Sequence, residues 1–163
     1  MTMIRPGTFK RNARRTHGIL DALLQGVDQT TGTTLRDGAD GWNCVEIVCH
    51  LRDFELVWQR RVRAIIATEQ APLEVFDHEG DAIRNDYASQ SLAAVWAERI
   101  QLRRESLALM EGWTDEQWHR VGVHPEAGPV DLLQLGMQMC MHDVDHAEQI
   151  ARVLGKTTGW IEG

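Results

Sequence analysis

The stretch DLLQLGMQMCMHDVDHAEQIARVL, residues 131–154, decides the fold that we expect for this chain. It contains no proline and its apolar residues recur at helical spacing, which predicts one long helix. His142 and His146 lie one turn apart in this helix, so both imidazoles can reach one ion. At about 100° per residue they share a stripe with apolar residues, and we therefore expect both to be buried. The apolar members of this stripe are Leu132, Leu135, Met139, Ile150 and Val153.

A third histidine, His50, lies inside a second apolar-periodic segment, EIVCHLRD, residues 46–53. Two ligands from one helix and one from another form a three-nitrogen metal site with an open coordination position. We expect His50, His142 and His146 to bind a divalent ion, zinc in the first place, with nickel, iron or manganese as alternatives. The other interpretation is that they are core histidines bonded to other side chains, because a buried neutral imidazole needs partners for both nitrogens.

The chemistry of such a site follows from its charge. Three neutral imidazoles leave the +2 charge of the ion uncompensated, so the pKa of a bound water would fall from about 15.7 toward 7. A bound thiol would be held as the thiolate that attacks electrophiles. Asp53, which follows His50 by one turn, is the candidate residue for orienting a ligand or acting as general base, with Glu46 and Asp143 as alternatives. Cys49 points to another face, and we do not expect it to bind or react.

The helix predicted over residues 131–154 carries a second apolar stripe on its opposite side, at alternating three- and four-residue steps. A helix that is apolar on two sides is buried on two sides. We expect the second stripe to face another subunit in a homodimer, because small Ala147 and Ala151 would allow close approach. The alternative is that the chain's own tail covers it with Trp160 and Ile161. The stripe consists of Leu133, Met137, Cys140, Val144, Ala147, Ala151 and Leu154.

Length and composition fit one globular domain over residues 1–163. Apolar residues make up 43% and charged residues 25% of the chain, as is usual for soluble proteins. The net charge of −7 argues against nucleic acid as a partner, because a negative surface repels phosphates. No apolar run approaches the roughly 20 residues of a membrane span, and the N-terminus has no signal-peptide core. Three cysteines without paired spacing indicate a reducing compartment, so we expect a cytoplasmic protein without membrane contact.

Four long helices account for most of the chain. Apolar periodicity predicts helices over about residues 9–27 and 91–111, besides the helix at residues 131–154. Another long helix begins after Asn43, which can cap it together with Glu46 in a capping box. The pattern therefore predicts an all-α fold, a four-helix bundle.

The connections between these helices differ in length and composition. Residues 30–41 are rich in Thr, Gly and Asp, which is typical of a loop. Residues 69–90 form a long connection, so the next helix need not run antiparallel to the previous one. The acidic stretch at residues 77–81 could bind a cation, although a solvated loop is the favoured interpretation. We expect the loops around Phe76–Tyr87 and His119–Gly128 to act as lids over the metal site.

Four further polar residues have no assigned chemistry. Arg99 and Arg103 fall within the inward stripe of the helix at residues 91–111. We favour the interpretation that they extend their charged ends to the rim over an anion-binding role. His17 lies at the border of the apolar face of the first helix and could line the pocket, whereas the sequence indicates no role for His124.

Two segments resemble a known family, the DinB-like (YfiT-like) four-helix-bundle proteins. Trp42-Asn43, leading into residues 46–53, is similar to the motif of the second helix of that family. The segment from Trp113 through HPEAG, residues 124–128, to HDVDHAEQI, residues 142–150, is similar to its loop and last helix. The most specific part of the resemblance is one histidine followed, at the right separation, by a His-x-x-x-His pair.

The resemblance covers roughly residues 9–155 and implies a fold, an assembly and a ligand set. It implies an up-down-down-up bundle that is usually a homodimer, with a divalent metal held by His50, His142 and His146. Characterised relatives include thiol S-transferases that use bacillithiol or mycothiol, and a maleylpyruvate isomerase. Many members have no known activity.

Two classes of function are consistent with the sequence. The first is a metal-dependent enzyme that transfers a low-molecular-weight thiol or hydrolyses a small substrate. The second is a non-catalytic metal-binding or stress-related dimer, in which the ion braces the bundle. An open fourth coordination position with a polar or cationic rim favours the enzyme, and a closed apolar pocket or a fourth protein ligand favours the second class.

Overall fold

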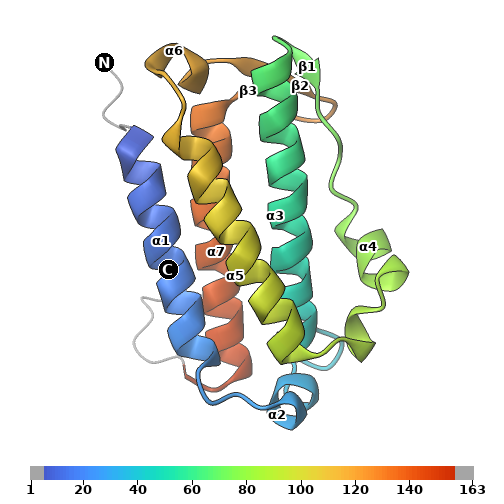
Figure 1. Cartoon of the computed structure of the whole chain (residues 1–163). Coiled ribbons are helices and arrows are strands. Elements are labelled where there is room, and N and C mark those ends of the chain that lie inside the picture. The colour runs from blue at the N-terminus through green and yellow to red at the C-terminus, as the bar shows by residue number, and fades with distance from the viewer. Residues whose placement is uncertain (1–5, 157–163) are drawn as a thin grey trace, which may run out of the picture.

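Four long helices form the body of the molecule in the computed structural model, which describes residues 6–156 (Figure 1). They are α1 (Pro6–Leu24), α3 (Cys44–Ala67), α5 (Leu92–Glu111) and α7 (Leu132–Val153). α3 packs against both α5 and α7, and α1 packs against α7. The predicted four-helix bundle is confirmed.

The starts of α3 and α7 are set by capping boxes. The Asn43 side chain accepts a hydrogen bond from the Glu46 backbone N–H at 3.0 Å, and the Glu46 carboxylate accepts one from the Asn43 N–H at 2.9 Å. Asp131 and Gln134 make the same pair of contacts at the start of α7. Each box satisfies backbone donors that have no partner within the helix. Glu46 therefore serves as a cap, as its spacing from Asn43 predicted.

One predicted loop contains a helix. Residues 30–41 were expected to be irregular, but α2 (Gln29–Thr34) occupies their first part. The Asp28 carboxylate caps this helix by accepting from the Thr31 N–H at 2.7 Å. The cap and the contacts of α2 with α3 and α5 outweigh the low helix propensity of Thr and Gly.

The acidic stretch at residues 77–81 belongs to a capped helix. Asp77 accepts a hydrogen bond from the Gly80 N–H at 3.0 Å and so caps α4 (His78–Arg84). The Arg84 guanidinium pairs with Asp77 at 2.9 Å and with Asp81 at 2.6 Å. These exposed carboxylates have a structural partner, in agreement with the interpretation that favoured a solvated segment over a cation site.

The connection between α3 and α5 runs back beside α3. In Figure 1, α4 and the short helix η1 (Tyr87–Ser89) lie along the outer side of α3. α5 consequently starts near α2, at the end of the bundle where α3 also starts, and it ends near α6. The length of this connection makes such a return possible.

A small sheet at the other end of the bundle was not predicted. β1 (Ala71–Pro72) pairs in parallel with β2 (Val121–His124), which pairs antiparallel with β3 (Gly128–Asp131). The hairpin of β2 and β3 follows α6 (Asp115–Trp118) and replaces the loop expected at residues 119–129. Its short strands were hidden from sequence reasoning because their pairing with β1 depends on a segment about 50 residues earlier.

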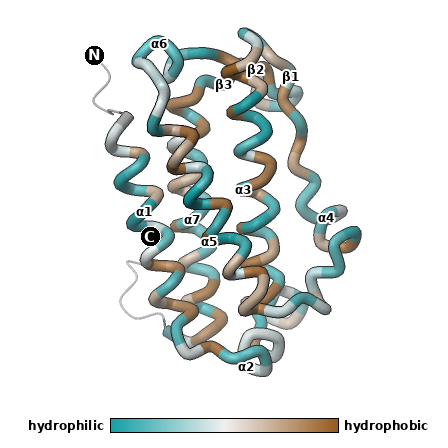
Figure 2. The backbone as a smooth tube through the Cα atoms, viewed as in Figure 1, coloured by the Kyte–Doolittle hydropathy of each residue, from teal (hydrophilic) through white to brown (hydrophobic). Residues whose placement is uncertain are grey.

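Hydrophobic and hydrophilic residues alternate along each of the long helices, as Figure 2 shows. The apolar residues pack between the helices, and burial of each large side chain stabilises the fold by about 1.5–3 kcal/mol. The largest fully buried apolar side chains are Leu20, Ile47, Leu51, Trp58, Ile65, Tyr87, Met110, Trp118, Leu132 and Leu135.

Part of the second apolar stripe of α7 packs within the same chain. Cys140, Ala147 and Ala151 are each only 7% exposed, and the Cys140 thiol lies 3.8 Å from the main-chain oxygen of Phe9 in α1. α1 and α3 contact α7 on two sides and bury most of the surface of these residues. Because two other helices pack against it, α7 needs two apolar faces even within a single bundle. Ala147 and Ala151 also line an apolar groove at the surface, so the expectation of a second subunit stays a prediction.

Other residues of that stripe remain on the surface. Met137 is 39% exposed and Val144 is 40% exposed. Trp160 and Ile161, the alternative cover, lie outside the described residues. In the described part of the chain, every helix is too short or too polar to cross a bilayer.

Candidate metal centre

The structure brings His50 of α3 together with His142 and His146 of α7. One ring nitrogen of each lies within 4.8 Å of the others, and the Nε2 atoms of His50 and His142 are 2.9 Å apart. The three rings have centroid separations of 4.5–4.9 Å. We call these residues the histidine group. Among residues 6–156 it is the only group of three or more His, Cys, Asp or Glu with ligand spacing.

Aromatic side chains hold the rings of the histidine group in place. Phe54, one turn after His50 in α3, stacks on His142 with a centroid separation of 3.7 Å. Phe76, from the connection after α3, stacks on His50 at 5.2 Å, and Trp42 contacts the same ring at 5.0 Å. These contacts restrict ring rotation and remove water from two of the three imidazoles.

Burial keeps the histidine group neutral. It lowers the pKa of His50 to about 3, with a further contribution from the neighbouring His146. Burial also lowers the pKa of His142 and His146. Neutral imidazole has the lone pair that coordinates a metal ion, so at pH 7 all three side chains are in the ligating form.

Gln149 selects the tautomer of His146. Its side-chain oxygen lies 2.8 Å from Nδ1 of His146 and accepts the ring proton there. The lone pair of His146 is consequently on Nε2. Such a partner on the second nitrogen is the usual arrangement for a histidine ligand of a metal.

The nitrogen positions fit a divalent ion. Zinc binds imidazole nitrogen at about 2.0–2.1 Å, so two nitrogen ligands of one ion lie about 3 Å apart or slightly more. The 2.9 Å between His50 and His142 is close to that spacing. The buried Nδ1 atoms of these two histidines have no hydrogen-bond partner among residues 6–156. In the alternative interpretation, core histidines bonded to other side chains, the Nε2 atoms of His50 and His142 share one hydrogen bond and Gln149 satisfies His146.

A cavity of about 640 Å³ opens on the histidine group. Both segments that were predicted as lids contribute to its wall, through Phe76 and His78 on one side and His124 and Glu126 on the other. The carboxylates that line it are not within ligand distance of all three histidines. The other lining residues include Asp40, Trp42, Phe54, Arg61, Gln138 and Gln149.

Asp53 is not brought to the histidine group. Its carboxylate accepts hydrogen bonds from Arg52 at 2.7 Å, Asn85 at 2.8 Å and Tyr87 at 2.6 Å, and it lines a different pocket. Burial by itself would raise the pKa of Asp53, but these donors hold it below the usual value. A carboxylate engaged in this way is a poor proton acceptor, so the geometry gives no support to a role as general base.

Asp143 belongs to a second buried polar cluster. Arg99 and Arg103 of α5 each pair with Asp143 at 2.8 Å, and both also pair with Glu55 of α3, at 3.2 and 2.9 Å. Thr16 of α1 donates to Asp143 at 2.6 Å. We call these five residues the ion network. Each of the four long helices contributes at least one side chain to it.

The expectation that Arg99 and Arg103 extend to the rim was wrong. Their exposed fractions are 1% and 2%, because Glu55 and Asp143 supply carboxylates inside the bundle. The two positive and two negative charges balance, although Nε and Nη1 of Arg99 have no partner among the described residues. Asp143 is thus held by two guanidinium groups, which lower its pKa against the effect of burial, and it is unavailable as a base.

The remaining candidates lie apart from the histidine group. His17 stacks on Trp96 of α5 at 5.1 Å and does not line the cavity. The three cysteines are free and buried, and burial raises the pKa of Cys49 to about 12. Cys49 is not among the grouped ligands, in agreement with what its face of the helix predicted.

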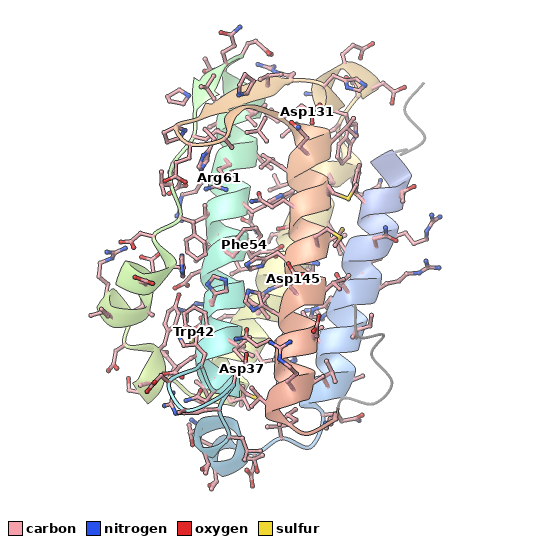
Figure 3. The ribbon with its side chains drawn as sticks, turned by 180° about the vertical axis from the view of Figure 1, so that it is seen from behind. Asp37, Trp42, Phe54, Arg61, Asp131 and Asp145 are labelled. Carbon is pink, nitrogen blue, oxygen red and sulfur yellow. The ribbon has the colours of Figure 1, made fainter. Side chains whose placement is uncertain are left out.

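Sequence reasoning missed several residues that shape the site. Phe54 and Gln149 follow His50 and His146 by four and three residues, so helical spacing could have revealed them. Phe76 carried no such signal, because the path of the connection at residues 69–90 places it at the cavity. Arg61 follows His50 by eleven residues in α3, so helical spacing places both on one face of that helix. Figure 3 shows Trp42, Phe54 and Arg61 in order along the bundle, from the α2 end toward the sheet.

Solved structures with a similar fold include proteins with metal or thiol chemistry in their descriptions. YfiT from Bacillus subtilis, described as a probable metal-dependent hydrolase with an unusual four-helix bundle topology, has a TM-score of 0.76 and 21% identity, covering 96% of this chain and 91% of its own. A mycothiol-dependent maleylpyruvate isomerase has a TM-score of 0.77 and 12% identity, covering 92% of this chain and 63% of its own. An uncharacterised protein from Clostridium difficile 630 has a TM-score of 0.75 and 9% identity, covering 97% of this chain and 100% of its own.

At these identities, the similarity to solved structures establishes the fold and no more. No curated protein sequence matches the chain. The family profile of the DinB superfamily matches residues 8–150, which include all three histidines and the cavity walls around them. With its bundle and this match over most of its length, the chain belongs to the DinB superfamily.

Proposed function

We propose that this protein is a metal-dependent enzyme of the hydrolase or thiol S-transferase type, with its ion held by His50, His142 and His146. The observation that carries the proposal is the position of the histidine group at an open cavity of about 640 Å³. No fourth His, Cys, Asp or Glu of residues 6–156 has ligand spacing to the group. A three-ligand site with access for a small molecule is typical of catalytic rather than structural zinc.

A bound divalent ion would supply Lewis-acid chemistry and would lower the pKa of a water or thiol that reaches it. The side chains of the protein prepare the site for this ion. Gln149 holds the ring proton of His146 on Nδ1, and Phe54 and Phe76 fix the other two rings. The aromatic wall excludes water from that side of the cavity, which strengthens electrostatic interactions within it.

The similar structures support the two reaction types in the proposal. YfiT is described as a probable metal-dependent hydrolase, and the isomerase is described as mycothiol-dependent. This chain spans 63% of the length of that isomerase, so only part of the isomerase has a counterpart here. We propose zinc as the ion, with nickel, iron and manganese as alternatives, and a small molecule or low-molecular-weight thiol as substrate.

The second candidate is a metal-binding bundle without turnover. The observation in its favour is the tight packing of Phe54 and Phe76 against two of the ligands, which an ion would brace further. The cavity beside the group, with Arg61 and His124 in its wall, favours the enzyme.

The test of the proposal begins with the metal content of the purified protein. We expect about one divalent ion per chain, and loss of that ion in the variant His142→Ala. The matched control is His78→Ala, because His78 lines the same cavity but is not in the histidine group. It should retain the ion.

The metal-loaded protein is then assayed in two arms, one with ester and amide substrates and one with bacillithiol or mycothiol and an electrophilic acceptor. Turnover in either arm that His142→Ala abolishes and His78→Ala retains supports the enzyme. Turnover that His142→Ala leaves unchanged would contradict the proposed site. Stoichiometric metal without turnover in both arms would favour the second candidate.

We also propose that the chain forms a homodimer and has the up-down-down-up order of helices that the family resemblance implies. The starts of α3 and α5 at one end of the bundle support that order. The surface beside α7 supports the dimer, because Ile19 and Val144 are 51% and 40% exposed and line an apolar groove of about 250 Å³. Light scattering at micromolar concentration should give a dimer that Val144→Lys dissociates. The control Ile83→Lys, at an 82% exposed position on α4, should leave it intact.

A further inference from the structure

Arg61 is a buried cation in the wall of the same cavity. It is 5% exposed, and its Nε and Nη2 atoms donate to the main-chain oxygen of Glu74 at 3.1 and 2.7 Å. No carboxylate of residues 6–156 pairs with it within 4.0 Å. The Glu74 carboxylate is engaged by Arg60 instead, at 2.7 and 3.0 Å. A buried charge without a counter-charge is costly, which gives Arg61 a reason to attract an anion.

His124 presents a second donor at the same place. Its Nδ1 atom accepts the backbone N–H groups of Glu126 and Ala127, both at 3.3 Å. The proton of the neutral ring is therefore on Nε2. That Nε2 lies 3.2 Å from Nη2 of Arg61, which is also a donor. Two donors this close together can share one acceptor atom that lies to one side, about 2.9 Å from both nitrogens.

The free edge of the guanidinium has the shape for a carboxylate. The Glu74 oxygen occupies Nε and one side of Nη2, whereas Nη1 has no acceptor among the described residues. Nη1 and the other side of Nη2 can donate two parallel hydrogen bonds to the oxygens of one carboxylate. The Nε2–H of His124 can donate a third.

We propose that Arg61 and His124 form an anchoring subsite for a carboxylate of the substrate, at the end of the cavity remote from the histidine group. Eleven residues separate His50 and Arg61 in α3, which corresponds to about 16 Å along the helix. Phe54 lies between them along α3, and both Phe54 and Phe76 line the same cavity. The ligand class is an elongated organic acid with an apolar or planar middle, whose reacting group reaches the histidines. The position of the reacting group at the histidines rests on the proposed function, whereas the subsite itself does not.

The test compares an acid with its uncharged analogue. Isothermal titration calorimetry with 4-phenylbutyrate and 4-phenylbutyramide should show that the wild-type protein binds the acid at least about tenfold more tightly, the lower end of what charge-assisted hydrogen bonds contribute. Arg61→Gln should abolish this preference. Arg60→Gln is the matched control, because it removes the same charge from the neighbouring exposed position and should retain the preference.

The possible failures are distinguishable. Equal binding of acid and amide by the wild type, or a preference that survives Arg61→Gln, would overturn the subsite. Circular dichroism checks the fold of each variant, and if Arg61→Gln is unfolded, His124→Leu provides the decision, with a several-fold loss of preference expected. The titrations are run on metal-free and zinc-loaded protein. If the metal-free protein prefers the acid over the amide but the protein does not bind zinc, the proposed function is contradicted and the subsite is supported.

Discussion

His142 and Asp143 are neighbours in α7, yet their side chains enter two polar clusters that balance charge differently. Asp143 joins the ion network, where two carboxylates meet two guanidinium groups. His142 joins the histidine group, where one nitrogen of each of three neutral rings lies within 4.8 Å of the others. The charges of the ion network balance within the chain, whereas the histidine group has the spacing of ligands for a cation from outside. A buried polar cluster with balanced charges can specify the packing of four helices. A buried cluster of neutral ligands is instead suited to bind an ion.

The largest effect is expected when the balance of the ion network is broken. Asp143→Asn removes one negative charge and leaves two buried guanidinium groups facing one carboxylate, so we expect a loss of about 3–5 kcal/mol in the free energy of unfolding. Urea unfolding measures it. Asp145→Asn is the matched control, because Asp145 is exposed two residues later in α7 and its loss should change stability by no more than about 0.5 kcal/mol. Similar stability of both variants would show that the ion network is not what holds the helices together.

A somewhat smaller effect on stability is expected when a zinc ion binds to the histidine group. Zinc at 100 times its dissociation constant should stabilise the protein by about 2.7 kcal/mol, because it binds the folded state alone. Thermal unfolding with and without a chelator measures this. The variant His142→Ala should show no zinc-dependent shift, and Asp145→Asn should show the full shift. A shift that persists in His142→Ala would place the ion elsewhere.

The metal-free protein should lose stability as the pH falls from about 6.5. The folded-state pKa of His50 is about 3, below the ordinary value of 6.5, and the pKa values of His142 and His146 are also lowered. Between pH 6.5 and pH 3 the unfolded chain therefore binds protons that the folded chain does not, so stability rises with pH through this window. The slope is up to about 1.4 kcal/mol per pH unit for each proton.

Urea unfolding at pH 7.5, 6.5 and 5.5 measures this slope. His50→Phe, which keeps an aromatic ring in place, should reduce it, whereas His78→Ala should retain it. A flat profile over this range would mean that the histidine group accepts protons as readily as solvent-exposed histidines do.

The smallest effect is expected from the outer contact of His146. Gln149→Ala removes the acceptor of its Nδ1 proton and should weaken zinc binding by about tenfold, with little change in metal-free stability. Competition with a chromophoric chelator measures the affinity. Gln138→Ala is the control, because Gln138 lines the cavity and makes no hydrogen bond to a histidine of the described residues, and the zinc affinity of this variant should stay at the wild-type value.

The four long helices and the three histidines were accessible from the sequence because their signals are local. Apolar periodicity, the capping pairs at Asn43 and Asp131, and the four-residue spacing of His142 and His146 are all properties of single helices. Periodicity also placed His50 on the border of an inward face of its helix.

What the sequence determined by itself is therefore the four long helices and the identity of the histidine group. Only the tertiary structure decided that Arg99 and Arg103 are buried, because their partners Glu55 and Asp143 come from other helices. It also decided that part of the second stripe of α7 packs within the chain, that β1 pairs with β2, and that Arg61 lines the cavity without a counter-charge. These outcomes depend on contacts between residues that are distant in the chain, and the energy of a buried charge is set by its partners rather than by its neighbours in sequence.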